Sequence, residues 1–305
     1  MVTLADVRQA RERIKGVAIH TPLLPAKFGP ANLYFKCENL QRGGAFKIRG
    51  AYNNLAVLAP DVRARGVTAY SSGNHAQAVA LSANLFGVPA TIVMLNQSVA
   101  EKIAQTKEYG AEIIFGGDSS ETIKARAEEI AAERSMTLIP PFNHPGTIAG
   151  QGTVGLEILE DLPEVETLVV PIGGGGLIAG IATAAKETRA SVRVVGVEPE
   201  GAPTLFASLS AGELVTLPGT NTIADGLKPV RAVAAVRRYV DDVVLVPDAA
   251  IMEAVAQLLK QEKLVVEPSG AASLAAVRSG KIAVSGPTVC VLSGGNITGD
   301  LLRSL

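Results

Sequence analysis

Short apolar runs alternate with longer segments of helical spacing along the whole chain, and this alternation is the strongest constraint on the fold. The apolar runs are continuous rather than alternately apolar and polar, which is typical of strands that are buried on both faces. Helical segments follow most of the runs and predict an α/β protein whose parallel sheets are covered by helices on both sides. The predicted strands lie at residues 33–38, 67–71, 90–95, 111–115, 167–172, 192–197, 243–246 and 288–292.

Composition narrows the range of partners. The 305 residues carry a formal net charge of −1 without a basic block, so nucleic acid is not an expected partner. No apolar run reaches about 18 residues and the N-terminus lacks an apolar leader, so we expect a cytoplasmic protein without membrane contact. Cys37 and Cys290 lie in apolar runs and are expected to be buried, reduced thiols. The three histidines lack the paired helical spacing of a metal site.

A stretch rich in turn formers, residues 140–146, separates two regular α/β regions. We therefore expect two domains. The large domain comprises residues 1–56 and 145–305, and the small domain, residues 57–144, is inserted into it.

Lys47 stands where a polar, glycine-bearing loop is expected to meet the start of a helix, between Phe46 and Ile48. An amine in such apolar surroundings can lose its charge by desolvation and become a nucleophile towards a carbonyl group. The structural alternative is a lysine that extends its ammonium group from a helix start into solvent. This stretch alone does not decide between the two.

A run of four glycines between an expected strand and an expected helix predicts an anion site. Glycines let the backbone approach a ligand closely, and the start of the helix adds its positive end, so a phosphate is the natural guest. A tight strand-to-helix turn is the structural alternative. The run consists of Gly173, Gly174, Gly175 and Gly176, followed by Leu177.

The same glycines also fit a dinucleotide fingerprint, Gly174-x-Gly176-x-x-Ala179. Glu198 lies 24 residues after Gly174, near the expected position of a ribose-binding acid. A nicotinamide-dependent dehydrogenase is therefore an alternative from a different class of enzyme. It leaves Lys47 unexplained.

Two further turns follow expected strands. Ser72, Gly73, Asn74 and His75 form a turn before a helix, whose backbone N–H groups and side chains suit a carboxylate, although such residues also serve as plain helix caps. Ser293 places a hydroxyl group after the last strand, beside two glycines.

Taken together and in this order, these stretches resemble the fold-type II pyridoxal phosphate enzymes, and among them the threonine/serine dehydratase and serine racemase family. The resemblance runs from Thr21 to Asn296 and implies the tryptophan synthase β-like fold, with two open, twisted and mostly parallel sheets flanked by helices. The matching motifs are Phe46-Lys47-Ile48-Arg49-Gly50-Ala51, Ser72-Gly73-Asn74-His75, Ala149-Gly150-Gln151-Gly152-Thr153, Gly173 to Leu177, Ala224-Asp225-Gly226, Glu267-Pro268 and Ser293-Gly294-Gly295-Asn296.

The resemblance implies a role for each matching residue. Lys47 would hold pyridoxal 5'-phosphate as a Schiff base and then act as the catalytic base, and Phe46 would pack beside the cofactor ring. Asn74 would contact the ring hydroxyl, and the turn from Ser72 to His75 would hold the substrate carboxylate. The glycine run would bind the phosphate, and Ser293 would hydrogen-bond the pyridine nitrogen.

The residue at position 293 bears on the reaction type. A serine hydroxyl is too weak an acid to protonate the pyridine nitrogen, which suits β-elimination or racemisation better than transamination. We therefore expect a dehydratase that converts L-threonine and L-serine to 2-oxobutyrate and pyruvate plus ammonia. Closure of the small domain over the substrate is expected as well.

Ser72 leaves two related activities open. The metabolic threonine dehydratases usually carry alanine at this position, whereas in racemases a serine faces the lysine as the second acid/base. A serine racemase or a 3-hydroxyaspartate dehydratase, in which Lys47 and Ser72 form the acid/base pair, is therefore the alternative within the family.

The family's divalent cation site would use Glu198, the carbonyl of Ala202 and a third acid. Thr204 stands at the third position here, so one carboxylate of the oxygen cage is missing and we expect activation by Mg²⁺ or Ca²⁺ to be weak or absent. The resemblance also implies a homodimer or homotetramer. Because the chain ends soon after the last motif, we expect no regulatory domain.

Overall fold

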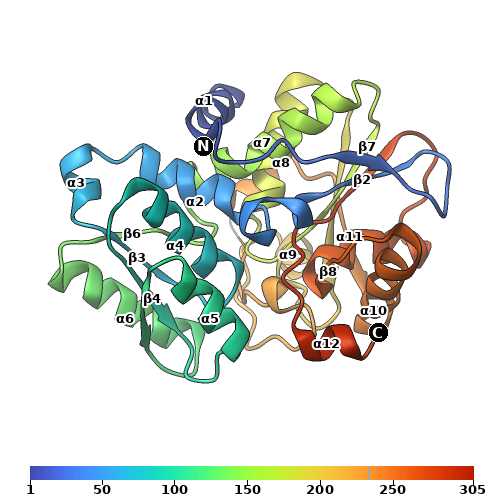
Figure 1. Ribbon diagram of the computed structural model, residues 1–305. Helices are drawn as coiled ribbons and strands as arrows, with labels where there is room; N and C mark the ends of the chain where they lie inside the picture. The colour runs from blue at the N-terminus through green and yellow to red at the C-terminus, as the bar shows by residue number, and fades with distance from the viewer. Residues whose placement is uncertain (233) are drawn as a thin grey trace.

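Two sheets organise the chain in the computed structural model, which describes residues 1–232 and 234–305 (Figure 1). The six-stranded sheet has the order β1-β2-β10-β7-β8-β9, and the four-stranded sheet has the order β5-β4-β3-β6. All neighbouring strands are parallel except β1 and β2. The predicted α/β class with two mostly parallel sheets is confirmed. The strands are β1 (Leu23–Pro25), β2 (Leu33–Lys36), β3 (Val67–Tyr70), β4 (Ala90–Met94), β5 (Glu112–Phe115), β6 (Thr137–Leu138), β7 (Thr167–Pro171), β8 (Arg193–Pro199), β9 (Asp242–Val246) and β10 (Thr288–Val291).

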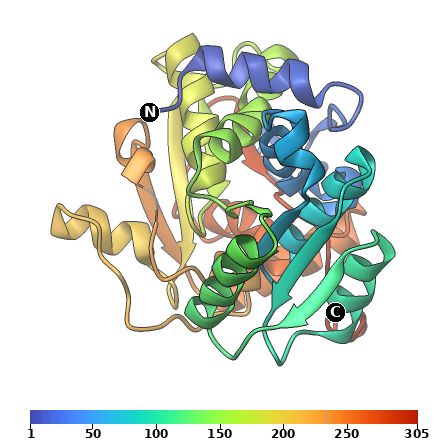
Figure 2. The ribbon, with the colours of Figure 1, turned by 90° about the vertical axis from the view of Figure 1, so that its left-hand side faces the viewer.

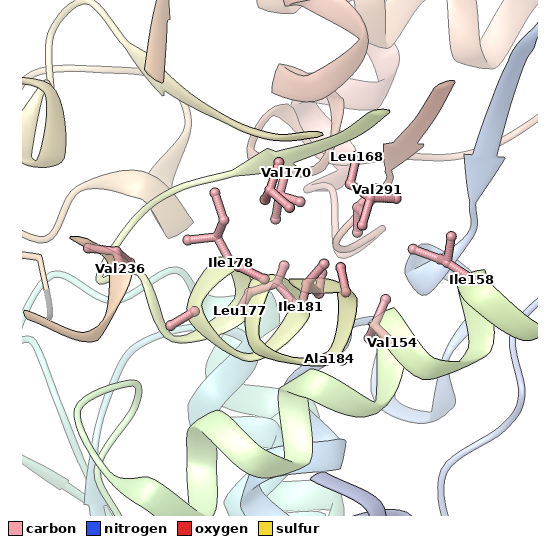
Figure 3. Packing of buried hydrophobic residues seen from close by; sticks show 14 of the residues in the cluster. Val154, Ile158, Leu168, Val170, Leu177, Ile178, Ile181, Ala184, Val236 and Val291 are labelled. Carbon is pink, nitrogen blue, oxygen red and sulfur yellow. The ribbon is translucent and has the colours of Figure 1, made fainter. Parts of the chain in front are cut away.

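The six-stranded sheet buries both of its faces because successive side chains of a strand point to opposite sides. Leu168 and Val170 of β7 pack with helices α1, α7 and α8 in one hydrophobic cluster, part of which Figure 3 shows. Val169, between them, packs with helices α10 and α11 in a second cluster. These helices are α1 (Leu4–Ile14), α7 (Pro145–Asp161), α8 (Gly176–Thr188), α10 (Asp248–Gln257) and α11 (Pro268–Arg278).

The four-stranded sheet is covered in the same way. Ile92 of β4 packs with helices α2 and α4 on one face, and the neighbouring Val93 packs with helix α6 on the other. Figure 2 turns this part of the molecule towards the viewer. The helices of this layer are α2 (Lys47–Ala56), α3 (Pro60–Ala64), α4 (Asn74–Phe86), α5 (Ala100–Glu108) and α6 (Ser120–Glu133).

Helix α2 connects the two layers. Ala51 and Leu55 belong to the core of the four-stranded sheet. On its other side α2 crosses α7 at two glycines, Gly50 and Gly150. A Cβ atom on Gly150 would lie 2.5 Å from the carbonyl oxygen of Arg49, so the two backbones pack in direct contact. The first residue of this shared helix is Lys47.

The structure corrects several expected boundaries. Pro145, expected in a boundary segment, begins α7, and Pro60 likewise begins α3. Proline is well suited to the first turn of a helix, where its missing N–H has no intrahelical partner. Helix α9 (Thr204–Ala211) lies in a segment with weak periodicity, and α12 (Gly299–Arg303) follows the last motif. The division into domains at residues 56 and 145 stays a prediction.

Both cysteines are free and buried, as expected. Burial raises the pKa of the Cys37 and Cys290 thiols to about 12, so neither is a reactive thiolate near neutral pH. No helix in the described parts of the chain is long and apolar enough to cross a membrane.

Candidate active site

Lys47 occupies a half-buried position at the start of α2. Its Nζ atom donates a hydrogen bond to the carbonyl oxygen of Pro141 at 3.0 Å and lies 5.0 Å from the centroid of the Phe46 ring. Burial lowers the pKa of the Lys47 amine to about 8, and the Glu267 carboxylate opposes this shift. About one amine in ten is therefore neutral at pH 7, which a nucleophile or a base requires.

The C-terminal motif supports the loop that leads to Lys47. The backbone N–H of Gly295 donates to the carbonyl of Gly44 at 2.8 Å, and the N–H of Phe46 donates to the carbonyl of Ser293 at 3.2 Å. Gly44 adopts a positive φ of 73°, and a Cβ there would collide with the Asn296 side chain. Two motifs at opposite ends of the sequence thus form one wall.

Asn74 and Glu267 lie beside this wall. The Asn74 amide donates to Glu267 Oε1 at 2.6 Å, and Asn296 Nδ2 donates to Asn74 Oδ1 at 2.8 Å. A Cβ on Gly294 would overlap the Glu267 carboxylate, so a larger residue at position 294 would displace this carboxylate. Burial raises the pKa of Glu267 to about 7, so both of its protonation states are populated near neutral pH. Lys47 interacts electrostatically with this carboxyl group.

His75 is buried, and its imidazole is directed away from the turn. Nε2 lies 2.9 Å from the carbonyl oxygen of Ile139 and must carry the proton, because a carbonyl only accepts. Burial, and then the charge of Lys47, lower the pKa of His75 to about 3. The imidazole is therefore neutral, and what this position offers a carboxylate is its backbone N–H in the first turn of α4.

Ser72 directs its hydroxyl group towards the loop after β4. Its Oγ accepts a hydrogen bond from the backbone N–H of Leu95 at 3.0 Å and lies 2.7 Å from Ser98 Oγ. Ser98 in turn donates to the carbonyl of Leu95 at 2.7 Å. By contrast, a Cβ on Gly73 would meet no atom within 4 Å, so the turn itself is open there. The interaction of Ser72 with Ser98 has no signal in the sequence.

Three of the four glycines in the loop have a structural reason to be glycine. Gly175 has a positive φ of 87° and directly precedes α8. A Cβ on Gly173 would lie 2.5 Å from the carbonyl oxygen of Gly226, and a Cβ on Gly174 would collide with the Phe142 ring. The loop therefore needs its glycines for packing as well as for any ligand.

The first turn of α8 still leaves backbone N–H groups without intrahelical acceptors, at the positive end of a 13-residue helix. Leu177 belongs to this turn, and its side chain is anchored in the core (Figure 3). The donor set fits a phosphate group.

The segment predicted as a domain boundary links the glycine loop to Lys47. The carbonyl of Pro141 accepts the bond from Lys47, and the next residue, Phe142, packs its ring against Gly174. Sequence reasoning missed both residues, because turn formers in this stretch indicate a connection rather than a wall of the site.

Ser293 lies at the end of β10 and is buried. Its carbonyl accepts the N–H of Phe46, whereas its hydroxyl has no hydrogen-bond partner within residues 1–232 and 234–305. The region around the Lys47 amine is therefore lined by four groups. They are the Lys47 amine itself, the Ser293 hydroxyl, the Asn74 amide and the glycine loop at the start of α8. These are the groups that would hold pyridoxal phosphate, and the residues present fit it.

Glu198, considered above as a ribose ligand and as a member of an incomplete cation site, has its carboxylate at the start of α9. Its carboxylate accepts hydrogen bonds from Thr204 Oγ1 at 2.7 Å and from the backbone N–H groups of Leu205 and Phe206 at 2.8 and 2.9 Å. The carbonyl of Ala202 accepts the N–H of Thr204 at 3.0 Å. The acid thus caps α9, and both of its carboxylate oxygens accept hydrogen bonds from this helix. The described residues contain no cluster of three or more metal-ligating acids, histidines or cysteines.

Comparison with known proteins agrees with this geometry. A family model described as pyridoxal-phosphate dependent enzyme matches residues 14–294. The chain is 46% identical over 302 residues to an L-threonine ammonia-lyase of Geobacter sulfurreducens, covering 97% of this chain and 75% of that protein. It is 41% identical over 304 residues to an L-threo-3-hydroxyaspartate ammonia-lyase of Saccharomyces cerevisiae, covering 97% of this chain and 93% of that protein.

Among solved structures, maize serine racemase superposes with a TM-score of 0.95 at 41% identity, covering 99% of this chain and 96% of that chain. Relatives of comparable identity therefore bear the names of different activities.

Proposed function

The chain belongs to the pyridoxal-phosphate dependent enzymes, within the threonine ammonia-lyase and serine racemase family, and we propose that it is an ammonia-lyase acting on L-threonine and L-serine. The products would be 2-oxobutyrate and pyruvate, with release of ammonia. The observation that carries the proposal is the half-buried Lys47 amine, with a pKa lowered to about 8, between the Asn74–Glu267 pair and the segment that packs on the glycine loop.

Each residue in the proposal performs a task that its surroundings support. When bound, pyridoxal phosphate supplies the electron sink that makes the α-proton of an amino acid acidic. The neutral Lys47 amine accepts that proton, and a base with a pKa near the working pH is the most effective. The backbone N–H groups at the start of α4 bind the substrate carboxylate, and the first turn of α8 binds the phosphate. The Ser293 hydroxyl would hydrogen-bond the ring nitrogen of the cofactor without protonating it.

The direction of the Ser72 hydroxyl favours the lyase over the racemase. A racemase needs a second acid/base on the face of the substrate opposite Lys47. Here the Ser72 Oγ accepts the N–H of Leu95 and lies against Ser98, both on the loop after β4. Racemisation through Ser72 is the second candidate, supported by the presence of the serine itself and by the similarity to a serine racemase.

The test is an end-product assay on the purified holoenzyme. L-threonine, L-serine, D-serine and L-threo-3-hydroxyaspartate are supplied separately, and 2-oxo acid and the opposite enantiomer are both quantified. Rapid 2-oxobutyrate formation from L-threonine supports the proposal. Mainly D-serine from L-serine, or a strong preference for hydroxyaspartate, would replace it with one of the alternatives. No product and no bound cofactor after borohydride reduction would overturn it.

A further inference from the structure

A buried charge network lies directly behind the Lys47 loop. Its members are Lys36 and Glu38, which are fully buried, Arg49, which is 1% exposed, and Glu157, which is 7% exposed. Lys36 also lies 3.5 Å from the part-exposed Asp161 carboxylate, which joins the network from its outer side. Buried charges are rare unless they are paired and hydrogen-bonded, so the position of this network needs an explanation.

Arg49 is held by two carboxylates at once. Its Nε and Nη2 atoms donate to the two oxygens of Glu38, each at 2.8 Å. Its Nη1 and Nη2 atoms donate to the two oxygens of Glu157 at 2.6 and 2.9 Å. Such paired hydrogen bonds fix the plane and the direction of a guanidinium group, which a point charge does not do.

The Glu38–Arg49 pair closes the loop that carries Lys47. Glu38 directly precedes residues 39–46, and Arg49 is the third residue of α2. The loop has only short 3-10 turns, η1 (Glu38–Leu40) and η2 (Arg42–Gly44), and positive φ angles at Gly43 and Gly44. Within the loop, the backbone N–H groups of Gln41 and Gly44 donate to the carbonyls of Glu38 and Gln41, and the ion pair joins Glu38 to the first turn of α2.

Glu157 extends this connection to α7, on the core of the six-stranded sheet. Lys36 Nζ lies 2.7 Å from Glu157 Oε2 and donates to the carbonyl of Thr21 at 2.6 Å. Lys36 thus pairs with the Glu157 carboxylate without contacting Arg49.

We propose that the Glu38–Arg49 pair is a positioning device that holds both ends of the Lys47 loop and so keeps the Lys47 amine in its buried position against Pro141. This role rests on the proposed function in one respect, namely that Lys47 is the reactive amine. Buried ion pairs are weak evidence for stability, because apolar replacements of similar volume are often as stable. Arg49, which binds both oxygens of two carboxylates, instead fixes the relative position of the segments that carry them.

The charged and titratable groups that interact with Lys47 are Glu267 of α11 and His75 of α4. Neither belongs to the charge network. A substitution in the Glu38–Arg49 pair can therefore change the pKa of Lys47 only by altering its burial. Lys36, whose ion-pair partners are Glu157 and Asp161, offers a matched control within the network.

The experiment measures the rate of Lys47 acylation against pH in the full chain freed of cofactor, with the site of modification identified by mass spectrometry. The variants are Arg49→Lys and Glu38→Gln, and the control is Lys36→Met, which removes an equally buried charge and leaves both forks of Arg49 in place. We expect half-maximal reactivity near pH 8 in the wild type and in Lys36→Met. In the two loop variants we expect it at about pH 9 or above, with a roughly fivefold lower rate at pH 8.

Wild-type reactivity centred near the ordinary lysine value would remove the basis of the proposed function, whatever the variants do. A lowered pKa in the wild type that persists in Arg49→Lys and Glu38→Gln would overturn the positioning role alone. An equal shift of the Lys47 pKa in Lys36→Met would also overturn the positioning role, since loss of any buried charge in the network would then explain the effect.

If neither loop variant folds, hydrogen exchange of the wild type decides. Amides of residues 39–46 protected to within about tenfold of those in α7 support the proposal, and exchange at unstructured rates contradicts it.

Discussion

The Asn74 amide and the Glu267 carboxylate, 2.6 Å apart, join the helix that follows β3 to the helix that precedes β10. The bond thus connects the four-stranded sheet layer to the six-stranded one, next to the Lys47 amine. Because the carboxyl group has a raised pKa of about 7, this connection changes its charge in the physiological range.

Glu267→Gln is expected to remove a pH dependence of stability. The folded protein holds the Glu267 proton up to about pH 7, whereas the unfolded chain releases it near the ordinary value of 4.5. The stabilisation is therefore complete below pH 4.5 and is lost as the pH rises through 7, by about 3 kcal/mol in all. Urea unfolding at pH 4.5 and pH 8 should show this loss in the wild type and not in the variant. Equal losses in the two proteins would contradict the assignment.

Lys47→Met is expected to stabilise the cofactor-free protein while abolishing activity. A buried ammonium group with a pKa lowered from 10.5 to about 8 is unfavourable below pH 8, and wild-type stability should rise between these two values. Allowing for the partial exposure of the side chain, the variant should gain about 1–3 kcal/mol at pH 7. Thermal unfolding measures the gain, and borohydride reduction should fix no cofactor on the variant. A variant less stable than the wild type would show that the amine is well solvated.

Ser98→Ala is expected to raise the ratio of racemisation to elimination severalfold. The Ser98 hydroxyl lies 2.7 Å from Ser72 Oγ and helps to hold it on the loop after β4, so its removal frees Ser72 to turn towards the substrate. Chiral analysis of the serine pool during turnover gives the ratio. The double variant Ser98→Ala with Ser72→Ala should lose the gain. An unchanged ratio in Ser98→Ala would mean that Ser98 does not restrain Ser72.

Gly174→Ala is expected to weaken cofactor binding at least tenfold, because the added methyl group collides with the Phe142 ring. Trimming the ring with Phe142→Ala in the same chain should restore part of the affinity. Gly219→Ala is the matched control, since a Cβ there meets nothing within 4 Å. Cofactor titration followed by absorbance measures all three. If Gly174→Ala binds as tightly as the control, the ring and the loop do not pack as described.

Chelation of divalent cations is expected to change the activity less than about twofold. Both oxygens of Glu198 already accept hydrogen bonds, one of them from the Thr204 hydroxyl, so a cation would have to displace the cap of α9. Activity after dialysis against a chelator, with and without added Mg²⁺ or Ca²⁺, checks this. A strong loss that either ion restores would place a cation site elsewhere.

Much of the fold followed from local pattern. Continuous apolar runs such as that around Val169 predict strands buried on both faces, and both faces of β7 are indeed packed. The capping box that begins α1 joins Thr3 and Asp6, which are three positions apart. Such signals are local, because propensity and capping depend on residues a few positions apart.

The contacts that define the site depend on distance in sequence and were not predictable in the same way. The pairing of Asn74 with Glu267 spans 193 positions, and Glu267 entered the sequence argument only as part of a motif without a role. Phe142 lies in a stretch of turn formers, and nothing local indicates that its ring covers Gly174. The sequence allows Glu198 to be a ribose or cation ligand. Only the structure shows that its carboxylate accepts a hydrogen bond from the first turn of α9.

The position of β10 has a consequence for how the protein is made. This strand, formed near the end of the chain, lies in the middle of the six-stranded sheet between β2 and β7. During synthesis, the edges of β2 and β7 that pair with β10 therefore stay unpaired until β10 has left the ribosome, whereas the strands of the four-stranded sheet can pair earlier. Unpaired edges invite association with other chains. The nascent protein is thus exposed to aggregation until β10 is available to pair.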